Sequence, residues 1–191
     1  MSAPESVSDV AEERARIGRA VLGAEADFAR LLADHYDRIY RLAYRFMGRR
    51  EDAEDVAQEV CIKLAQHLPG YRFEAPFAVW LSRMVMNTAR DALRGRKRRQ
   101  NRETELFADL EPVAPNENPE RLVSAREMLR LVNDLPDGLR AAVILVYCEG
   151  MSHAEAGRAL ACAESTVSWR IHEARKFLQN LLGKEVKHGG I

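Results

Sequence analysis

Apolar side chains recur every three to four residues along most of this chain, which is the spacing of one face of an α-helix. The first sustained run starts at Ala24 and includes Phe28, Ile39 and Phe46. Gly48 is a suitable end for that helix, because glycine tolerates the left-handed conformation that follows many helix C-termini. The pattern therefore predicts a long amphipathic helix that ends near Gly48.

Two more helices are expected before the middle of the chain. The second covers about 51–67, and the pair Pro69 and Gly70 then breaks it. Pro76 is a suitable start for the third, because proline is tolerated in the first turn of a helix. Residues 1–24 are small, polar and charged, with no sustained apolar face, and we expect them to form a flexible leader that is loose or weakly helical.

The middle of the chain has a different composition. Residues 101–120 contain six acids, one arginine and three prolines. Such a stretch cannot bury enough apolar surface to order itself, so it predicts a linker. Helical spacing resumes near Glu120, is interrupted at Pro136 and returns over 139–150.

The predicted fold class is therefore all-α, with two small helical domains joined by a flexible acidic linker. The expected boundaries are a leader at 1–24, a first domain at 25–100, the linker at 101–124 and a second domain at 125–185.

Composition excludes several classes of protein. No apolar run approaches the ~20 residues of a membrane-spanning helix, so we expect no membrane insertion. The first twenty residues lack the apolar core of a signal peptide, which predicts a cytoplasmic protein. Cys61, Cys148 and Cys162 are too few for a disulfide framework and are expected to be buried, reduced thiols. A metal site built from Cys148, His153 and Cys162 matches no recognised ligand spacing.

The last forty or so residues follow a helix-turn-helix pattern. Ser152 and Glu155 have the spacing of a capping box, which marks a helix start. Gly157 is small where a second helix must approach, and a turn at 161–165 precedes a helix whose inward residues include Val167. Such a second helix enters the DNA major groove. The expected DNA-contacting side chains are Ser165, Thr166, Ser168, Trp169, Arg170, His172 and Arg175. A plain helical hairpin with a solvated charged face is the alternative.

Net charge is zero, but charges are separated into blocks along the chain. A basic run ends the third predicted helix and suits DNA phosphates, although such a run can also be a solubilising tail. Aromatic rings lie upstream, and binders of single strands combine stacking rings with a cationic track. Phe77 and Trp80 are expected to be at least partly core, whereas Tyr71 is the best candidate for an exposed ring. The basic run comprises Arg90, Arg94, Arg96, Lys97, Arg98, Arg99 and Arg102.

The second predicted helix carries an acidic face around Asp52, Asp55 and Glu59, with Gln58 beside them. This face is either a solvated surface or a docking site for a basic protein partner. The chain contains no pattern typical of catalysis, such as a phosphate-binding glycine loop or a nucleophile with its base. We therefore expect a protein that is not an enzyme and that needs no cofactor or metal.

In this order, four stretches resemble bacterial sigma factors of the small extracytoplasmic-function class. They are FARLLADHYDRIYRLAYRFMG, DAEDVAQEVCIKL, FAVWLSRMVMNTARDALRGRKRR and LPDGLRAAVILVYCEGMSHAEAGRALACAESTVSWRIHEARKFL. The resemblance covers about 25–180. It implies a first domain that binds RNA polymerase and opens the −10 promoter element, and a second that reads the −35 element.

The resemblance also implies roles for individual residues. Asp52, Asp55, Gln58 and Glu59 form the expected polymerase-binding set, and Trp80 matches a structural tryptophan. Tyr71 and Asn87 lie where relatives capture an unpaired base. The expected −10 set is Tyr71, Arg83, Asn87, Arg90, Arg94, Arg96, Lys97 and Arg98.

The recognition helix departs from the family pattern, because Ser168 and Glu173 stand where relatives often carry basic residues. The implied partners are core RNA polymerase, promoter DNA and an anti-sigma factor. Two alternatives are a conventional helix-turn-helix regulator that binds DNA as a homodimer, and a sigma mimic that captures a regulator.

Overall fold

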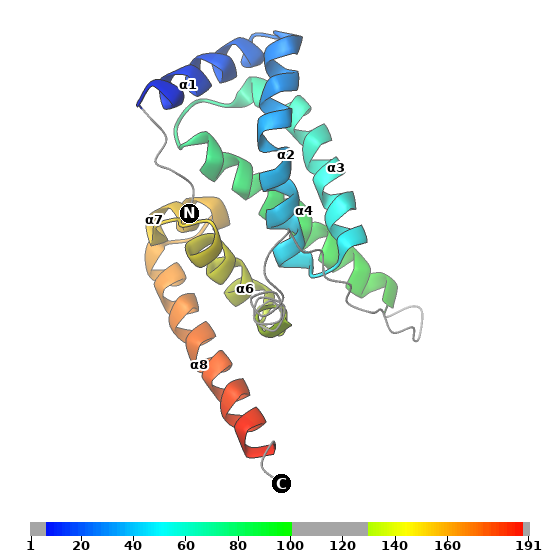
Figure 1. Ribbon diagram of the computed structural model, residues 1–191, viewed down its shortest axis with the longest axis vertical. Helices are drawn as coiled ribbons and strands as arrows, with labels where there is room; N and C mark the ends of the chain where they lie inside the picture. The colour runs from blue at the N-terminus through cyan, green and yellow to red at the C-terminus, as the bar shows by residue number, and fades with distance from the viewer. Residues whose placement is uncertain (1–6, 101–129, 189–191) are drawn as a thin grey trace, which may run out of the picture.

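The computed structural model describes residues 7–100 and 130–188, and every regular element in those ranges is helical (Figure 1). An amino-terminal unit (residues 7–100) and a carboxy-terminal unit (residues 130–188) lie on either side of the predicted linker, which falls outside the described residues. The elements are α1 Val7–Val21, α2 Glu25–Met47, α3 Arg50–His67, the 3₁₀ turn η1 Leu68–Gly70, α4 Phe77–Gln100, α6 Asp137–Val143, the π-helical turn η2 Ile144–Cys148, α7 His153–Leu160 and α8 Glu164–His188.

In the amino-terminal unit, α2, α3 and α4 pack around one core (Figure 1). Phe46, Leu64 and Leu81, one from each helix, are at most 1% exposed. Gly48 ends α2 with φ 74°, and its N–H donates to the Tyr44 carbonyl, as the sequence predicts. The third helix begins directly after Pro76, also as predicted. The helical spacing of the sequence therefore identifies these three helices.

Of the leader expected at 1–24 to be loose or weakly helical, the described part is helical, and it is packed rather than loose, because α1 occupies 7–21 and packs across α2. Ile17 is 2% exposed and Ala20 is 6% exposed. Ion pairs hold the rest of the helix: Arg16 contacts Asp34 and Arg19 contacts Asp27 on α2, each with nitrogen–oxygen distances below 3 Å. Because α1 is held by few apolar contacts and by ion pairs, its sequence shows little apolar periodicity.

In the carboxy-terminal unit, the buried side chains of α6, α7 and α8 continue the core of the amino-terminal unit. Leu135, Leu145, Ala156 and Val167 are fully buried in it. The apolar run expected as one helix over 139–150 is divided between α6 and the π-helical turn η2. Much of α8 projects away from the rest of the molecule, and α7 packs against α4 (Figure 1). The two units are therefore in direct contact.

Candidate polymerase and nucleic-acid interface

The outer face of α3 presents the acidic surface that the sequence predicts. Asp55, Gln58 and Glu59 are exposed, while Ala57 and Val60 on the opposite side are fully buried. The structure adds Ile62, which is 55% exposed one helical turn beyond Gln58 and Glu59. An exposed apolar side chain bordered by charges is typical of the centre of a protein interface. The apolar pattern of 51–67 favours a buried Ile62, which the structure contradicts, although its spacing of four residues from Gln58 would place it on this face.

Asp52 faces α4 and lies apart from this surface. Its carboxylate accepts a hydrogen bond from Arg96 on α4 at 2.5 Å, and Arg49 lies 3.9 Å away. Both Asp52 and Arg96 are about one-quarter exposed. The structure thus pairs one expected polymerase contact with one expected DNA contact, so neither charge is free while the pair is formed.

The exposed ring expected at Tyr71 is wrong. Tyr71 is 7% exposed, and its hydroxyl donates to the Ala75 carbonyl at 2.7 Å. Its ring lies 4.6–5.5 Å from the centroids of Phe73, Phe77 and Trp80. Burial raises the pKa of Tyr71 above its ordinary value. The ring is buried because the chain from Gly70 to Pro76 folds back over α4 and α1 covers it, contacts that no local sequence pattern encodes.

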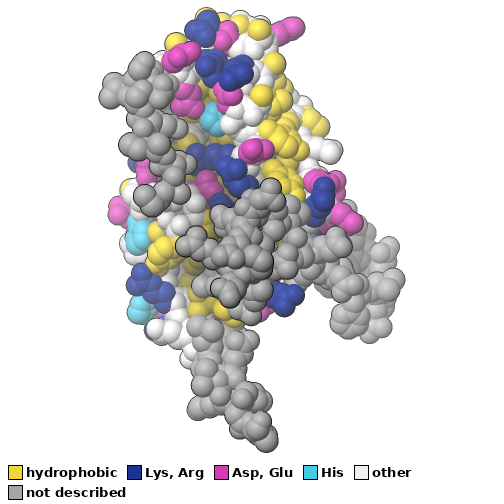
Figure 2. All heavy atoms as spheres, in the orientation of Figure 1, with side chains coloured by type: hydrophobic (Ala, Val, Ile, Leu, Met, Phe, Trp, Pro, Cys, Tyr) yellow, Lys and Arg dark blue, Asp and Glu magenta, His cyan; other side chains and the backbone are white. Residues whose placement is uncertain are grey.

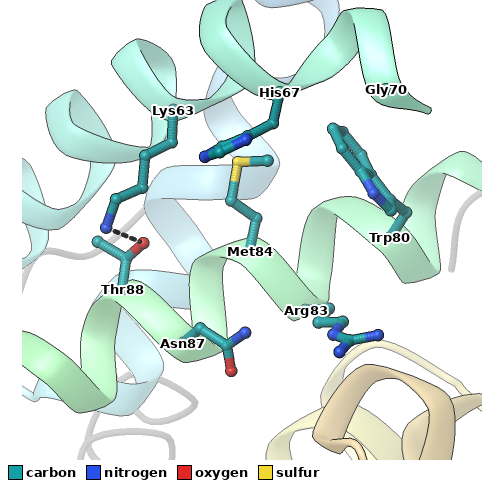
Figure 3. Close-up of a pocket in the computed structure, with 8 residues that line it drawn as sticks. All are labelled: Lys63, His67, Gly70, Trp80, Arg83, Met84, Asn87 and Thr88. Atoms are coloured by element: carbon teal, nitrogen blue, oxygen red, sulfur yellow. Dashed lines mark hydrogen bonds between the residues drawn. The ribbon is translucent and has the colours of Figure 1, made fainter.

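A cleft of about 460 Å³ opens beside this aromatic cluster, between α3 and α4 (Figure 3). Asn87 and Arg83 are exposed at it, and Trp80 is half-buried along its wall. Lys63 and His67 line the other side, and Lys63 donates to the Thr88 hydroxyl at 3.2 Å. The cleft brings together an amide that can read a base edge, an aromatic ring and cations. The sequence predictions contained Arg83, Asn87 and Trp80 but missed Lys63 and His67.

The remaining cations of the −10 set lie further along α4. Arg94 is exposed and pairs with Asp91 at 2.8 Å. Arg90 is half-buried, and burial, followed by the positive charge of Arg170, lowers the pKa of its guanidinium. Lys97 and Arg98 belong to α4, but their side chains lie outside the described residues.

The helix-turn-helix has the geometry that its sequence indicates. The Ser152 hydroxyl accepts from the Glu155 N–H, and the Glu155 carboxylate accepts from the Ser152 N–H at 2.9 Å, which completes the capping box. A Cβ at Gly157 would lie 2.8 Å from the Cys162 carbonyl, so only glycine fits there without movement. Ala161 turns the chain with φ 52°, in the left-handed region.

The exposed side of α8 carries most of the expected DNA contacts. Trp169 is 59% exposed, and Thr166 is partly buried. Arg170 departs from the expected outward direction, because it lies against Gly138 and donates to the Cys162 sulfur at 3.6 Å. The exposed members of the set are Ser165, Ser168, Trp169, His172 and Arg175.

Neighbouring side chains orient two residues on this face. The Ser168 hydroxyl lies 2.9 Å from His153 Nδ1, and Arg175 donates to the Tyr147 hydroxyl at 2.6 Å. Tyr147 is 55% exposed and adjoins the face, and no local sequence pattern distinguishes it from the apolar run in which it lies.

Comparisons with known proteins assign both units to one family. Residues 31–99 match the model of sigma-70 region 2, and residues 125–178 match that of sigma-70 region 4. The ECF RNA polymerase sigma factor SigE of Mycolicibacterium smegmatis is 36% identical over 178 residues, which cover 87% of this chain and 68% of the relative. SigM of Mycobacterium tuberculosis is 33% identical over 85% of this chain and 81% of its own length. This chain belongs to the ECF sigma factors.

Solved structures support the same fold for this sigma factor. CnrH, solved in complex with the cytosolic domain of CnrY, has a TM-score of 0.67 and 26% identity, covering 90% of this chain and 97% of CnrH. The sigma factor RpoE of Bartonella quintana, solved with the anti-sigma factor NepR, has a TM-score of 0.69 at 24% identity over 82% of this chain and 97% of RpoE. The all-α fold predicted from the sequence is therefore confirmed.

Two further observations concern the described residues of the sigma factor. They contain no group of three or more His, Cys, Asp or Glu side chains that could hold a metal ion, and none of their helices is long and apolar enough to cross a membrane. Cys148 is exposed rather than buried as expected, whereas Cys61 and Cys162 are half-buried.

Proposed function

We propose that this sigma factor binds core RNA polymerase through the outer face of α3 and directs promoter-specific initiation. The observation that carries the proposal is the arrangement of the amino-terminal unit, where the exposed face of Asp55, Gln58 and Ile62 and the cleft beside Asn87 lie on different sides of α3. One helix can then hold the polymerase while the cleft remains accessible to DNA. The sigma factor makes no covalent bond itself and acts in the cytoplasm, where the polymerase works.

The cleft supports a role in opening the −10 element. The Asn87 amide can donate to and accept from a base edge, Trp80 offers a ring for stacking, and Arg83 can neutralise phosphate. Lys63 lies 3.3 Å from Glu59 and would exchange that partner for phosphate. Because Tyr71 is buried, we assign the stacking surface to Trp80 in this conformation.

The exposed face of α8 supports recognition of the −35 element. Trp169 can contact thymine methyl groups, and Ser168 and Arg175, both exposed, can contact phosphate or base edges. Neither unit needs to bind DNA tightly alone, because the polymerase holds both and raises the effective concentration of the second site. An anti-sigma factor is a further proposed partner, by analogy with the complex of RpoE and NepR.

The test is run-off transcription with purified core polymerase. We expect a promoter-dependent transcript from the intact sigma factor, and its absence on every candidate template would contradict the function. A homodimeric repressor would instead bind a palindromic duplex tightly without polymerase, and a sigma mimic would give no transcript.

The docking face is tested with Asp55→Arg combined with Gln58→Ala. Loss of two central contacts should weaken polymerase binding by about 2 kcal/mol, or roughly thirtyfold. Asp37→Arg, an exposed charge reversal on α2, is the matched control and should leave binding unchanged. Circular dichroism should report the same helix content for all three proteins. Unchanged affinity of the double variant would show that the polymerase binds elsewhere.

A further inference from the structure

A tyrosine and an arginine from different elements meet at the outer side of the carboxy-terminal unit. Arg175 of α8 donates to the Tyr147 hydroxyl of η2 at 2.6 Å, and its guanidinium carbon lies 6.0 Å from the centroid of the tyrosine ring. Tyr147 is 55% exposed, and Arg175 is exposed as well. A hydrogen bond and a cation–π contact therefore favour one orientation of the guanidinium in the free protein. Figure 2 shows Lys and Arg side chains next to His side chains at the left edge of this unit.

Tyr147 lies in the π-helical turn η2, at the point where the apolar run leaves the core. The Glu149 N–H donates to the Ile144 carbonyl at 3.1 Å, which is the hydrogen bond of a π-helical turn. Ile144 and Leu145 are fully buried, whereas the Tyr147 ring is exposed. Turns of this kind are rare and occur frequently at functional sites. An aromatic side chain that such a turn presents to solvent is therefore a candidate for binding.

Arg175 lies on the same stripe of α8 as Ser168 and His172, because residues four and seven positions apart share one face of a helix. All three side chains are exposed. A recognition helix contacts base edges through its N-terminal residues. Arg175 lies about 10 Å along the helix from Ser168, a distance comparable with the ~12 Å width of the major groove. We therefore expect Arg175 at the edge of the DNA site, where the backbone phosphates lie.

The hydrogen-bonding capacity of the pair suits an anion with several acceptor oxygens. A tyrosine hydroxyl carries one proton, and that proton remains for another acceptor because the Tyr147 oxygen accepts from Arg175. Among the described residues, Tyr147 has no acceptor for this proton and Arg175 has no carboxylate partner. The pair thus offers one O–H group, several N–H groups and one positive charge. A phosphodiester accepts from such a set of donors.

The surroundings of the pair favour DNA phosphate over a carboxylate of a protein partner. The stripe of Ser168, His172 and Arg175 is polar and contains no acid. Protein–DNA interfaces are more polar and more positively charged than interfaces between proteins. An exposed arginine also loses conformational freedom when it binds, and Tyr147 reduces that loss because it orients the guanidinium beforehand.

We propose that Tyr147 and Arg175 form a clamp that binds one backbone phosphate at the edge of the −35 element. Tyr147 donates its hydroxyl proton to the phosphate and positions Arg175, which donates beside it. The contact extends the DNA surface beyond the helix-turn-helix, since η2 precedes α7, and it reads no base sequence. The clamp rests on the proposed function, because it requires that α8 face the −35 element.

The clamp is tested by measuring how holoenzymes bind a promoter duplex that gives a run-off transcript. Tyr147→Phe removes the hydroxyl but retains the ring, and should weaken duplex binding about fivefold. Arg175→Gln should weaken binding about tenfold. It should also lower the steepness of the salt dependence by about one ion, because one phosphate is no longer neutralised. Tyr147→Phe should retain the wild-type salt dependence, since it removes no charge.

Two matched controls make the same chemical changes elsewhere. Tyr36→Phe and Arg30→Gln alter exposed side chains of α2 in the amino-terminal unit. Both should bind the duplex with the affinity and salt dependence of the wild type. Circular dichroism should show equal helix content in every variant.

Ethylation of single phosphates identifies the contact directly. With the wild-type holoenzyme, one ethylated phosphate at the edge of the −35 element should reduce binding. Tyr147→Phe and Arg175→Gln should both reduce the sensitivity to ethylation at that same phosphate, Arg175→Gln more strongly. A variant that only disturbs the structure would leave this sensitivity in place. The clamp is wrong if both variants retain the wild-type pattern, or if they change it at different phosphates.

The remaining outcomes separate the clamp from its alternatives. Wild-type affinity for DNA in both variants would overturn the clamp, and weaker retention on immobilised polyglutamate would then assign the pair to an acidic protein surface. Failure of the proposed function would appear differently, as no run-off transcript from the wild-type holoenzyme on any candidate template. That result would overturn the clamp together with the proposed function.

Discussion

At the scale of single residues, Tyr71 and Asn87 differ in a way that changes how each should be tested. Tyr71 is packed among three other rings, and Asn87 is exposed at the cleft. Tyr71→Ala should lower the free energy of unfolding by about 3–5 kcal/mol, because it removes a buried aromatic side chain. Asn87→Ala should change stability by less than about 0.5 kcal/mol.

The functional effects of the two variants should therefore differ. Asn87→Ala should reduce permanganate reactivity of unpaired thymines in the −10 element while duplex binding by the holoenzyme persists. Urea unfolding followed by circular dichroism measures stability in parallel. If Tyr71→Ala proved fully stable yet unable to open the promoter, Tyr71 would have to leave the core during opening.

Ala161 carries backbone strain that a substitution can relieve. Its φ of 52° lies in the left-handed region, where an L-residue with a Cβ is disfavoured by about 1–2 kcal/mol. Ala161→Gly should raise the free energy of unfolding by about 0.5–1 kcal/mol after the entropy loss of glycine is subtracted. Ala33→Gly, at an exposed interior position of α2 where φ is not positive, should lower it. A loss of stability in Ala161→Gly would contradict this explanation.

At the scale of elements, the turn between α7 and α8 depends on one missing side chain. Gly157→Ala would place a methyl group against the Cys162 carbonyl and should destabilise the protein by about 1–3 kcal/mol. Gly18→Ala in α1 meets no atom within 4 Å and should be stabilising by up to about 1 kcal/mol. Thermal unfolding of the two variants measures this contrast. Similar shifts in both would mean that helix propensity, rather than contact, decides the effect at Gly157.

The capping box at the start of α7 should make the stability of the folded protein decrease at acid pH. Hydrogen bonds from the Ser152 backbone N–H, and then from its hydroxyl, lower the pKa of Glu155 in the folded protein. A lowered folded pKa stabilises the protein at pH values above the unfolded pKa, and this contribution is lost as pH falls through the folded pKa. Glu155→Gln, which retains a capping side chain, should therefore lose less stability than wild type between neutral pH and about pH 3. Parallel pH profiles for the two proteins would contradict this role.

The elements also differ in how far their sequences predict them. The capping box, Gly157 and the inward Val167 encode the helix-turn-helix locally, so the sequence predicted it correctly. By contrast, α1 depends on ion pairs to α2, and a pattern search over neighbouring residues cannot detect partners such as Arg16 and Asp34, eighteen positions apart.

Local periodicity also predicted part of the candidate site, and contacts between distant segments explain the residues that it placed wrongly. Asp55, Gln58 and Asn87 are exposed because helical periodicity fixes the side on which they lie. The positions of Tyr71 and Arg170 depend on contacts with distant segments, α1 for the first and Gly138 for the second. Sequence periodicity assigns a residue to a face, but tertiary packing decides whether that face is covered.

At the scale of the whole molecule, the contact between the two units has no sequence signature. Glu149 pairs with Arg45 across 104 positions, and an acid after an apolar run gives no indication of its partner. The contact combines ion pairs of Glu149 with Arg38 and Arg45 and an apolar core that continues through both units. The charged part of the contact should weaken with ionic strength, whereas the apolar part should not weaken with added salt.

The different responses of charged and apolar contacts to salt can be measured. The Debye length falls from about 10 Å at 0.1 M salt to about 3 Å at 1 M, and Arg38 and Arg45 are exposed enough for ions to screen them. The radius of gyration of the wild-type protein should therefore increase with added sodium chloride. In Glu149→Arg the same contact is repulsive, so salt should leave the radius unchanged or reduce it. Equal salt responses in the two proteins would show that expansion arises outside this contact, and opposite responses would identify the ion pairs of Glu149 as its source.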